Sequence, residues 1–460
     1  MVFSSPVFLF CFFPALLLVY FIARGRVRNW VLVLASLFFY AFGEPKTVFL
    51  MLLSILVNYI AGTLIERSAG RRKLILVLAV IYNLAVLFVF KYLNFTMDTI
   101  NTIIGGNITV KKIALPIGIS FYTFQIMSYV IDVYRGKCAA QKNLVSLALY
   151  ISLFPQLIAG PIVRYVDIEK QIRERKSTLD GVYHGFLRFG LGFAKKVLIA
   201  DQLAPLVDTV FAGQNASVPL YWIGAVAYAL QIYYDFSGYS DMAIGLGKIF
   251  GFEFAENFNY PYIAASIREF WRRWHISLST WFRDYLYFPL GGSRKGKKRT
   301  YFNLLVVFLA TGLWHGASFN FVIWGLYYGA FLILERIGLG KLLEKGPEWI
   351  GHIYTILIVV VGWVFFRAED LPGAVAYLES MFTPGGNDMA VMNYVMDLQY
   401  WFCIGAGIIF STPVLRKLLQ PDHSGPVRRF VYPVCVLLLF VTAICYMVGS
   451  GYSPFLYFRF

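Results

Sequence analysis

Charged residues are scarce in this chain of 460 residues, since Asp, Glu, Lys and Arg make up 14% of it while hydrophobic residues make up 59%. A soluble globular protein carries roughly 25% charged residues. The composition therefore excludes an ordinary soluble domain and predicts a polytopic, all-α membrane protein. Cysteine is also sparse, and the five cysteines have no metal-ligand or redox spacing, so we expect them to pack as small hydrophobic side chains.

Several motifs of catalysis and cofactor binding are absent as well. The chain contains no Gly-x-Ser-x-Gly elbow, Walker loop, His-Glu-x-x-His pair or dinucleotide fingerprint. Neither a metal nor a permanently bound cofactor is therefore expected. Internal repeats at the scale of helical pairs or of half the chain are also missing, which disfavours a transporter built from paired broken segments.

The net charge of +16 could suggest nucleic acid, but the basic residues sit in loops between apolar runs. Basic clusters at 24–28, 67–73, 135–142 and 294–299 alternate with nearly uncharged connections. This pattern is typical of a topology signal with contacts to anionic lipid, and it excludes nucleic acid as the expected partner. It places the N-terminus outside and the basic loops in the cytosol.

Apolar runs long enough to approach the roughly 20 residues of a membrane span occur along the whole chain. We expect about eleven true spans among runs at 5–23, 29–43, 47–65, 74–92, 113–134, 180–199, 218–236, 301–317, 319–336, 350–366, 396–411 and 428–449. The first run lacks a basic n-region and a cleavage site, so it is predicted to be a retained helix. The dipeptides Pro155-Gln156 and Gly160-Pro161 would break a straight helix, so they predict a re-entrant stretch over 144–160.

The whole chain is interpreted as one membrane domain with three parts. Residues 1–112 and 337–460 are plain spans and loops, whereas 113–336 are crowded with polar and aromatic side chains. Function is therefore expected in the middle part.

His315 is the strongest candidate for chemistry, because an ionisable side chain deep in an apolar run is costly and usually faces a cavity or pathway. If its helix begins near Tyr301, fourteen steps of ~1.5 Å place His315 about 20 Å from the cytosolic surface. A neutral imidazole at that depth could act as a general base towards an acceptor hydroxyl. The alternative is a histidine that only satisfies another buried polar group. Gly312 and Gly316 flank it, leaving room for close helix packing or for a substrate.

His275 is the second candidate, in a stretch from 268 to 284 that alternates aromatic and basic residues at helical spacing. An interfacial helix explains most of this pattern, with Trp271, Trp274 and Trp281 at the headgroup level and arginines reaching to phosphate. His275 differs because it can hydrogen-bond or titrate near neutral pH.

Two carboxylates and five hydroxyls lie between residues 231 and 241, at the end of an apolar run. Helix capping at the start of a following helix accounts for Ser237 and Asp241 as well as any function does. Asp235 is harder to explain in this way and could line a polar tunnel, since polar groups at that depth must be hydrogen-bonded or hydrated.

These motifs together resemble the membrane-bound O-acyltransferase family, and specifically its bacterial polysaccharide-acetylating branch. The resemblance rests on FWRRWHISLS at 270–279 and LWHGA at 313–317, supported by LPIGISFYTFQ at 115–125, FPQLIAGP at 154–161, YDFSGYSD at 234–241 and PLGG at 289–292. The resemblance covers nearly the whole chain. The motifs PLGG at 289–292 and WHGA at 314–317 favour the alginate-acetylating type over the type that D-alanylates teichoic acid.

The resemblance implies a ring of spanning helices around a central tunnel in a bacterial cytoplasmic membrane. It makes His315 the catalytic histidine and His275 a second polar position nearer the thioester. Acetyl-CoA would be the cytosolic acyl donor, an exported polysaccharide the acceptor, and an extracytoplasmic serine hydrolase-like acetyltransferase the partner. Candidates for lining the tunnel or orienting the reacting groups are Gln125, Gln156, Tyr234, Asp235 and Trp314.

The competing interpretation is a non-enzymatic transporter or channel that conducts along the same buried polar residues. The acceptor stays open between alginate, cellulose, another exopolysaccharide and peptidoglycan.

Overall fold

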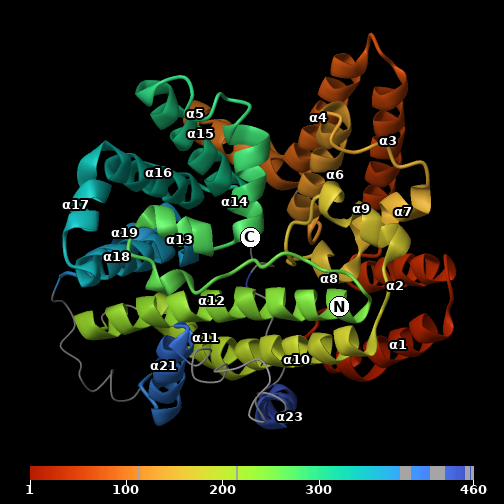
Figure 1. The fold of residues 1–460 in the computed structure, drawn as a ribbon. Helices are drawn as coiled ribbons and strands as arrows, with labels where there is room; N and C mark the ends of the chain where they lie inside the picture. Colours follow the sequence, from red (N-terminus) through yellow and green to blue (C-terminus); the bar gives the residue numbers. More distant parts are fainter. Residues whose placement is uncertain (112, 214–215, 384–394, 415–429, 451–455, 457–460) are drawn as a thin grey trace. The chain divides into compact units, whose positions relative to one another are not determined.

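The computed structural model describes residues 1–111, 113–213, 216–383, 395–414, 430–450 and 456. All regular elements in these ranges are helices (Figure 1), which confirms the predicted all-α class for them. The chain divides into two compact units, one made of 1–189 with 242–255 and the other of 190–241 with 256–460. The single membrane domain expected from the sequence stays a prediction.

The first unit contains the apolar helices of the N-terminal part. They are η1 (Phe8–Phe12), α1 (Phe13–Ile22), α2 (Val27–Gly43), α3 (Thr47–Arg67), α4 (Arg72–Leu87), η2 (Phe88–Tyr92), α5 (Leu93–Ile104), α6 (Ile119–Tyr134), α7 (Leu144–Ser152), α8 (Phe154–Leu157), α9 (Tyr165–Glu174) and the start of α10 (Leu179–Lys195). The helical course is interrupted at Leu153, between α7 and α8. A break in 144–160 was expected from its prolines, and its re-entrant course stays a prediction.

Helices α3, α4 and α6 pack side by side in this unit (Figure 1). A pair of buried amides joins the first two, since Asn58 donates to Asn83 Oδ1 at 3.1 Å and Asn83 donates back to Asn58 Oδ1 at 2.8 Å. The two side chains thereby satisfy each other inside apolar helices, where an unpaired amide would be costly.

The second unit holds both histidines singled out above. Its helices are η3 (Lys196–Ala200), α11 (Asp201–Ala212), α12 (Val218–Ile249) as far as Asp241, η4 (Pro261–Ile263), α13 (Ile267–Arg273), α14 (Ile276–Phe282), η5 (Arg283–Tyr287), α15 (Lys297–His315), α16 (Phe319–Leu334), η6 (Glu335–Leu339), α17 (Gly340–Lys345), α18 (Glu348–Arg367), α19 (Leu371–Ser380), α21 (Leu398–Phe410) and α23 (Tyr432–Ser450).

Five helices of the described chain are long and apolar enough to cross a membrane. They are Thr47–Arg67, Arg72–Ile104, Phe319–Lys345, Glu348–Arg367 and Tyr432–Gly449. Three shorter apolar helices cover Phe8–Ile22, Val27–Gly43 and Leu398–Phe410. Several predicted runs are thus present as apolar helices, whereas the count of about eleven spans and their ring stay predictions. The first two residues of the expected span at 428–449 lie outside the described residues.

Two explanations of local sequence patterns are wrong. The first is helix capping by Ser237 and Asp241, one of the two explanations left open for them, because both residues lie inside the uninterrupted helix α12. Packing against α10 explains the glycine between them, because a Cβ on Gly238 would lie 2.6 Å from the carbonyl oxygen of Gly192. Helices α10 and α12 therefore touch backbone to backbone at this point, and a larger residue would separate them.

The second error concerns the stretch from 268 to 284, predicted as one interfacial helix. It forms two short helices, α13 and α14, that meet at His275. Trp271, Trp274 and Trp281 are 8%, 2% and 6% exposed, so their rings pack against other protein groups and do not form a headgroup belt. Aromatic and basic residues in alternation fit a buried and an interfacial helix equally well, because arginine reaches outward from either.

Candidate active site

His315 is the last residue of α15 and is 4% exposed. Its ring is surrounded by aromatic rings, with centroid distances of 4.9 Å to Trp314, 5.1 Å to Trp324 of α16 and 5.1 Å to Phe366 of α18. Three helices of the second unit thus contribute to the pocket of one imidazole. The helix starts four residues earlier than the expected Tyr301, at Lys297.

Glycines hold α15 and α16 together beside this histidine. A Cβ on Gly312 would lie 2.2 Å from the carbonyl oxygen of Phe321, and one on Gly325 would lie 2.4 Å from the carbonyl oxygen of Phe308. Gly316 is equally tight, with Phe321 ring atoms 2.1 Å from a Cβ. Of the two explanations offered by the sequence, close helix packing is therefore the one the structure supports for Gly312 and Gly316.

His275 lies at the break between α13 and α14 and is 1% exposed. Its φ of 44° is in the left-handed region, which is uncommon for a residue other than glycine. Its ring contacts Phe236 of α12 at a centroid distance of 4.7 Å and Trp314 at 6.0 Å. Trp314 therefore touches both histidine rings, so the two histidines predicted to act together do lie around one indole.

Asn257 holds the His275 segment in place, and sequence analysis did not single it out. Its side-chain oxygen accepts hydrogen bonds from the Ser277 backbone N–H at 3.1 Å and the Ser277 hydroxyl at 2.9 Å. The same oxygen lies 3.1 Å from His275 Nδ1. The Asn257 carbonyl also accepts from the Ile276 N–H at 2.9 Å. Four polar contacts thus bind the histidine loop to the segment before α13.

The start of α13 is fixed from another helix. Both carboxylate oxygens of Glu335 accept backbone hydrogen bonds there, from Ile267 at 2.6 Å and from Arg268 at 3.0 Å. Ser266 caps the same helix by accepting from the Glu269 N–H at 3.1 Å. A carboxylate at a helix N-terminus is favourable because the first N–H groups have no partner within the helix. The segment from Ile267 to Ser277 is thereby held at its start by Glu335 and at its end by Asn257.

Burial lowers the pKa of His275 to about 3, since desolvation disfavours the imidazolium. The residue lies outside the five helices that could span a membrane, between two helices of seven residues each. The His275 ring is therefore neutral at physiological pH and able to accept a proton or a hydrogen bond.

Two other predicted residues, Tyr234 and Asp235, lie on α12 in the same unit and are bound to other partners. The Tyr234 hydroxyl donates to the Gly407 carbonyl of α21 at 2.6 Å. Asp235 Oδ1 accepts from Lys196 at 2.8 Å, and Oδ2 accepts from the Leu456 N–H at 2.8 Å. Lys196 also donates to Asp201 at 2.9 Å. These contacts make both residues part of the framework, and their expected role in the tunnel stays a prediction.

The glutamines of the prediction, Gln125 and Gln156, belong to the first unit and are fully buried there. Gln125 lies on α6, and Gln156 lies on α8, where its amide donates to the Tyr150 carbonyl. A role for either glutamine beside the histidines stays a prediction.

Comparison with known proteins decides the family. The family model described as "MBOAT, membrane-bound O-acyltransferase family" matches residues 37–340, which include both histidines. The chain belongs to the membrane-bound O-acyltransferase family. It is therefore an acyltransferase with a multi-pass membrane location, and the alternative of a non-enzymatic transporter or channel is set aside.

Two relatives narrow the place of this acyltransferase within the family. A protein of Pseudomonas aeruginosa named "Probable alginate O-acetylase AlgI" is 47% identical, with the whole of both chains covered. A peptidoglycan O-acetyltransferase of Helicobacter pylori is 33% identical, covering all of this chain and 98% of that protein. A teichoic acid D-alanyltransferase of Bacillus subtilis is more distant, at 29% identity over 54% of this chain. Of these three relatives, the two O-acetylating ones are the more similar to this chain, as the motifs predicted.

Proposed function

We propose that this acyltransferase takes acetyl from cytosolic acetyl-CoA and passes it across the membrane for O-acetylation of an exported polysaccharide, either an alginate-type exopolysaccharide or peptidoglycan. The transfer runs directly or through an extracytoplasmic serine hydrolase-like partner. The observation that carries the proposal is the convergence of His315 and His275 on Trp314 in a chain whose O-acetylating relatives match over its full length.

His315 is proposed as the general base. It removes the proton from an acceptor hydroxyl while the hydroxyl oxygen attacks the acetyl carbonyl carbon of the thioester. The tetrahedral intermediate then collapses, the carbon–sulfur bond breaks, and the coenzyme A sulfur takes up the proton held by the imidazole. Such a base contributes typically ~10²–10⁴-fold to the rate.

A buried site suits this reaction, because water that reached the acetyl group would hydrolyse it. The aromatic rings of Trp324 and Phe366 contact each other and both pack against the His315 ring, which restricts its movement. A fixed imidazole keeps its lone pair directed at one position, which is where the acceptor hydroxyl is expected.

The test uses purified full-length protein in liposomes with acetyl-CoA labelled in the acetyl group. We expect thioester turnover in the wild type and a loss of ~10²–10⁴-fold in His315→Ala. His352→Ala is a matched control, because this histidine is half-buried on α18 and contacts the Ala264 carbonyl at 3.3 Å. Absence of thioester turnover in a folded wild type supplied with the partner, or equal activity in His315→Ala, would reject the proposal.

A further inference from the structure

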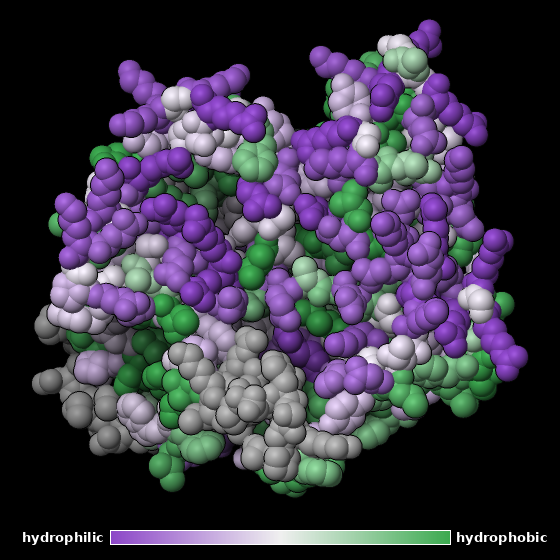
Figure 2. Space-filling view, viewed as in Figure 1, coloured by the Kyte–Doolittle hydropathy of each residue, from purple (hydrophilic) through white to green (hydrophobic). Residues whose placement is uncertain are grey.

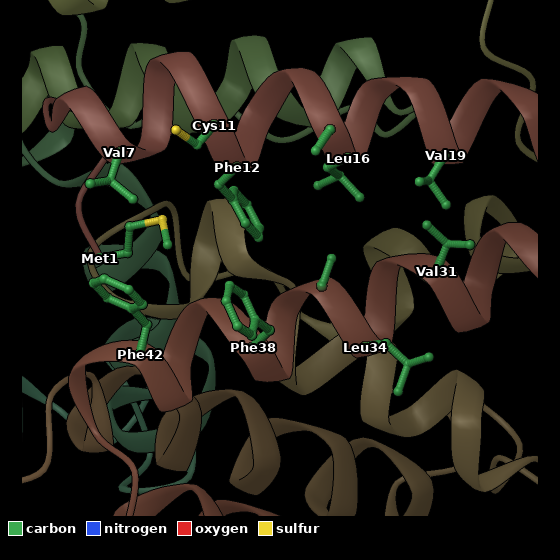
Figure 3. Close-up of a pocket in the computed structure, with 12 residues that line it drawn as sticks. Met1, Val7, Cys11, Phe12, Leu16, Val19, Val31, Leu34, Phe38 and Phe42 are labelled. Carbon is green, nitrogen blue, oxygen red and sulfur yellow. The ribbon is translucent and has the colours of Figure 1, made fainter.

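A groove of about 460 Å³ runs between the η1–α1 helix and α2 in the first unit (Figure 3). Phe12, Leu16 and Val19 on one helix point into it across from Val31 and Phe38 on the other. The other lining residues are Met1, Val7, Cys11, Ala15, Leu34, Ala35 and Phe42. All of these side chains are apolar or weakly polar, so the groove offers nothing to a polar ligand.

The groove has the size of a lipid tail. Twelve residues separate Val7 from Val19, which is about 18 Å of helix and close to half of a ~30 Å hydrocarbon layer. Its volume lies in the roughly 300–1,000 Å³ range of small-molecule sites. Ala15 and Ala35 keep it wide, and exposed side chains at its rim, with Val19 51% and Phe38 57% exposed, leave it open along its length.

Positive charge gathers at one end of the groove. Val19 and Val31 lie on either side of the connection between α1 and α2, which contains Arg24 and Arg26. Both arginines are exposed, and the first turn of α2 contains no acidic residue to neutralise them. Figure 2 shows hydrophilic side chains where α1 connects to α2 and hydrophobic ones over α1.

A third arginine, Arg28 in the first turn of α2, is held in place. The Arg28 guanidinium donates to the Ala23 carbonyl at 3.0 Å and lies over the Tyr20 ring at 5.1 Å. Guanidinium groups bind phosphate oxygens through paired N–H donors. An apolar groove of one leaflet's depth, with arginines at one end, matches an acyl chain attached to an anionic headgroup.

We propose that this groove binds one acyl chain of an anionic phospholipid, with the headgroup phosphate against Arg24 and Arg26. The site is separate from the chemistry around His315 and does not depend on the proposed reaction. Zwitterionic lipids have the same chain but no net negative charge, so they bind more weakly. The difference is expected to be on the order of fivefold for each arginine.

The experiment measures retained lipid. The full-length protein is reconstituted in vesicles of phosphatidylglycerol and phosphatidylcholine in equal amounts, extracted in mild detergent, and its lipid quantified per chain by mass spectrometry. We expect about one retained phosphatidylglycerol in excess over phosphatidylcholine, loss of the excess in Arg24→Gln/Arg26→Gln, and loss of the lipid itself in Ala35→Trp.

Matched controls separate this site from general lipid contact. Arg71→Gln/Lys73→Gln removes two exposed charges at the start of α4 in the same unit, and Leu78→Trp adds a large ring to an exposed position of that helix. Both should behave as the wild type. Equal retention in Ala35→Trp and wild type, or an excess that survives the double glutamine variant, would overturn the proposal. The Arg24→Gln/Arg26→Gln variant leaves the apolar packing intact. It therefore tests the proposed lipid site even if Ala35→Trp fails to fold.

Asn257 supports a second, independent inference, which concerns His275. The Ser277 backbone N–H can only donate, so the Asn257 atom that it faces at 3.1 Å must be the amide oxygen and not the nitrogen. That oxygen is an acceptor only, and His275 Nδ1 lies 3.1 Å from it. The Ser277 hydroxyl lies 3.4 Å from Nδ1, but its one hydrogen is donated to the Asn257 oxygen at 2.9 Å. Nδ1 therefore carries the hydrogen. A neutral imidazole has one N–H, so Nε2 holds the lone pair.

We infer that Asn257 is a positioning residue that locks His275 in the Nδ1–H tautomer, so that His275 acts through Nε2 as a hydrogen-bond acceptor. The consequence for acyl transfer rests on the proposed function. In this tautomer neutral His275 cannot donate a hydrogen bond from Nε2 to the thioester carbonyl oxygen. It can accept one from a hydroxyl or another N–H, which places it on the nucleophile's side of the reaction.

The tautomer is measured directly by ¹⁵N NMR of protein labelled at histidine. The chain has five histidines, so the His275 signals are identified by their absence in His275→Gln. We expect a protonated Nδ1 and an unprotonated Nε2 in the wild type, the same in Asn257→Asp, and a mixture of tautomers in Asn257→Leu. Asn259→Leu, at an exposed asparagine two residues away, should match the wild type.

A protonated Nε2 in wild-type His275 would overturn the inference, as would an unchanged spectrum in Asn257→Leu. Turnover of acetyl-CoA is followed on the same samples. Activity should survive in Asn257→Asp and fall in Asn257→Leu. An Nδ1–H tautomer in a protein without thioester turnover would reject the proposed function and leave the tautomer assignment standing.

Discussion

The rings of His275 and Trp314 meet edge to face with centroids 6.0 Å apart, and the same indole lies 4.9 Å from His315. The two histidines come from different segments, one at the break after α13 and the other at the end of α15. Their relative position therefore depends on a side chain that has no acid–base chemistry of its own.

Replacing this indole should lower activity without removing a reacting group. In Trp314→Ala the two imidazoles lose their common contact, and we expect kcat for acetyl-CoA turnover to fall on the order of 100-fold, as for a misplacement of about 1 Å. Trp314→Phe retains a ring and should lose much less. Equal losses in the two variants would show that spacing between the histidines is not what the indole provides.

Glycine pairs in the α15–α16 contact give a test of stability. A methyl group at Gly312 would collide with the Phe321 carbonyl at 2.2 Å, whereas one at Gly329 has its nearest neighbour at 3.5 Å. We expect Gly312→Ala to destabilise the protein by about 1–3 kcal/mol through overpacking. Gly329→Ala should remain within about 0.5 kcal/mol of the wild type or become slightly more stable. Thermal unfolding in detergent compares the two, and similar midpoints would contradict the close approach.

The buried ion cluster of Lys196, Asp201 and Asp235 predicts a large loss of stability when one charge is removed. Asp235→Leu leaves Lys196 with one carboxylate in an interior site, and we expect a cost of about 3–5 kcal/mol. Lys196→Met combined with Asp235→Leu should recover part of it. The surface pair of Arg173 and Glu169, whose side chains are 58% and 24% exposed, is the control, since its loss costs at most about 1 kcal/mol. Loss of kcat in a fully stable Asp235→Leu protein would instead support the tunnel role.

Burial of His275 predicts an acid-sensitive fold. Its pKa is about 3 when folded and near 6.5 when free, so between these values the unfolded chain binds the proton and the folded one does not. Stability therefore falls as the pH drops below about 6.5, by up to ~1.4 kcal/mol per pH unit. Unfolding midpoints measured from pH 7.5 to 5 should drop more steeply in the wild type than in His275→Gln. If the unfolding midpoints of the wild type and of His275→Gln fall equally with pH, a group other than His275 is responsible.

The two histidines could be predicted from the sequence because they differ chemically from their neighbours. His315 and His275 stand out because an imidazole is unusual among apolar residues, and the structure places both around Trp314. Burial of Trp271 and Trp274 could not be predicted, since an indole suits a protein interior and a membrane interface equally well. The continuity of α12 was missed for a similar reason, because Ser237 and Asp241 favour helix starts in general and the close approach of Gly238 to Gly192 is set by tertiary packing.

Asn257 could not have been found from a pattern, because it lies in an irregular segment where asparagine is common. Lys196, in contrast, could have been predicted to form a buried ion pair. A lysine inside the apolar run at 180–199 and an aspartate at the end of another run each need a partner of opposite charge, and together they predict a bond between two helices.

Helix α16 contributes none of the proposed reacting groups, yet both histidine segments are attached at its ends. The Phe321 carbonyl in its first turn meets Gly312 of α15, and Glu335, directly after its last turn, accepts hydrogen bonds from the first residues of α13. Neither attachment uses an imidazole. A chain in which both histidines are replaced should therefore keep its architecture, and such a protein, which is inactive under the proposed mechanism, is the form best suited to trapping the acyl donor for structure determination.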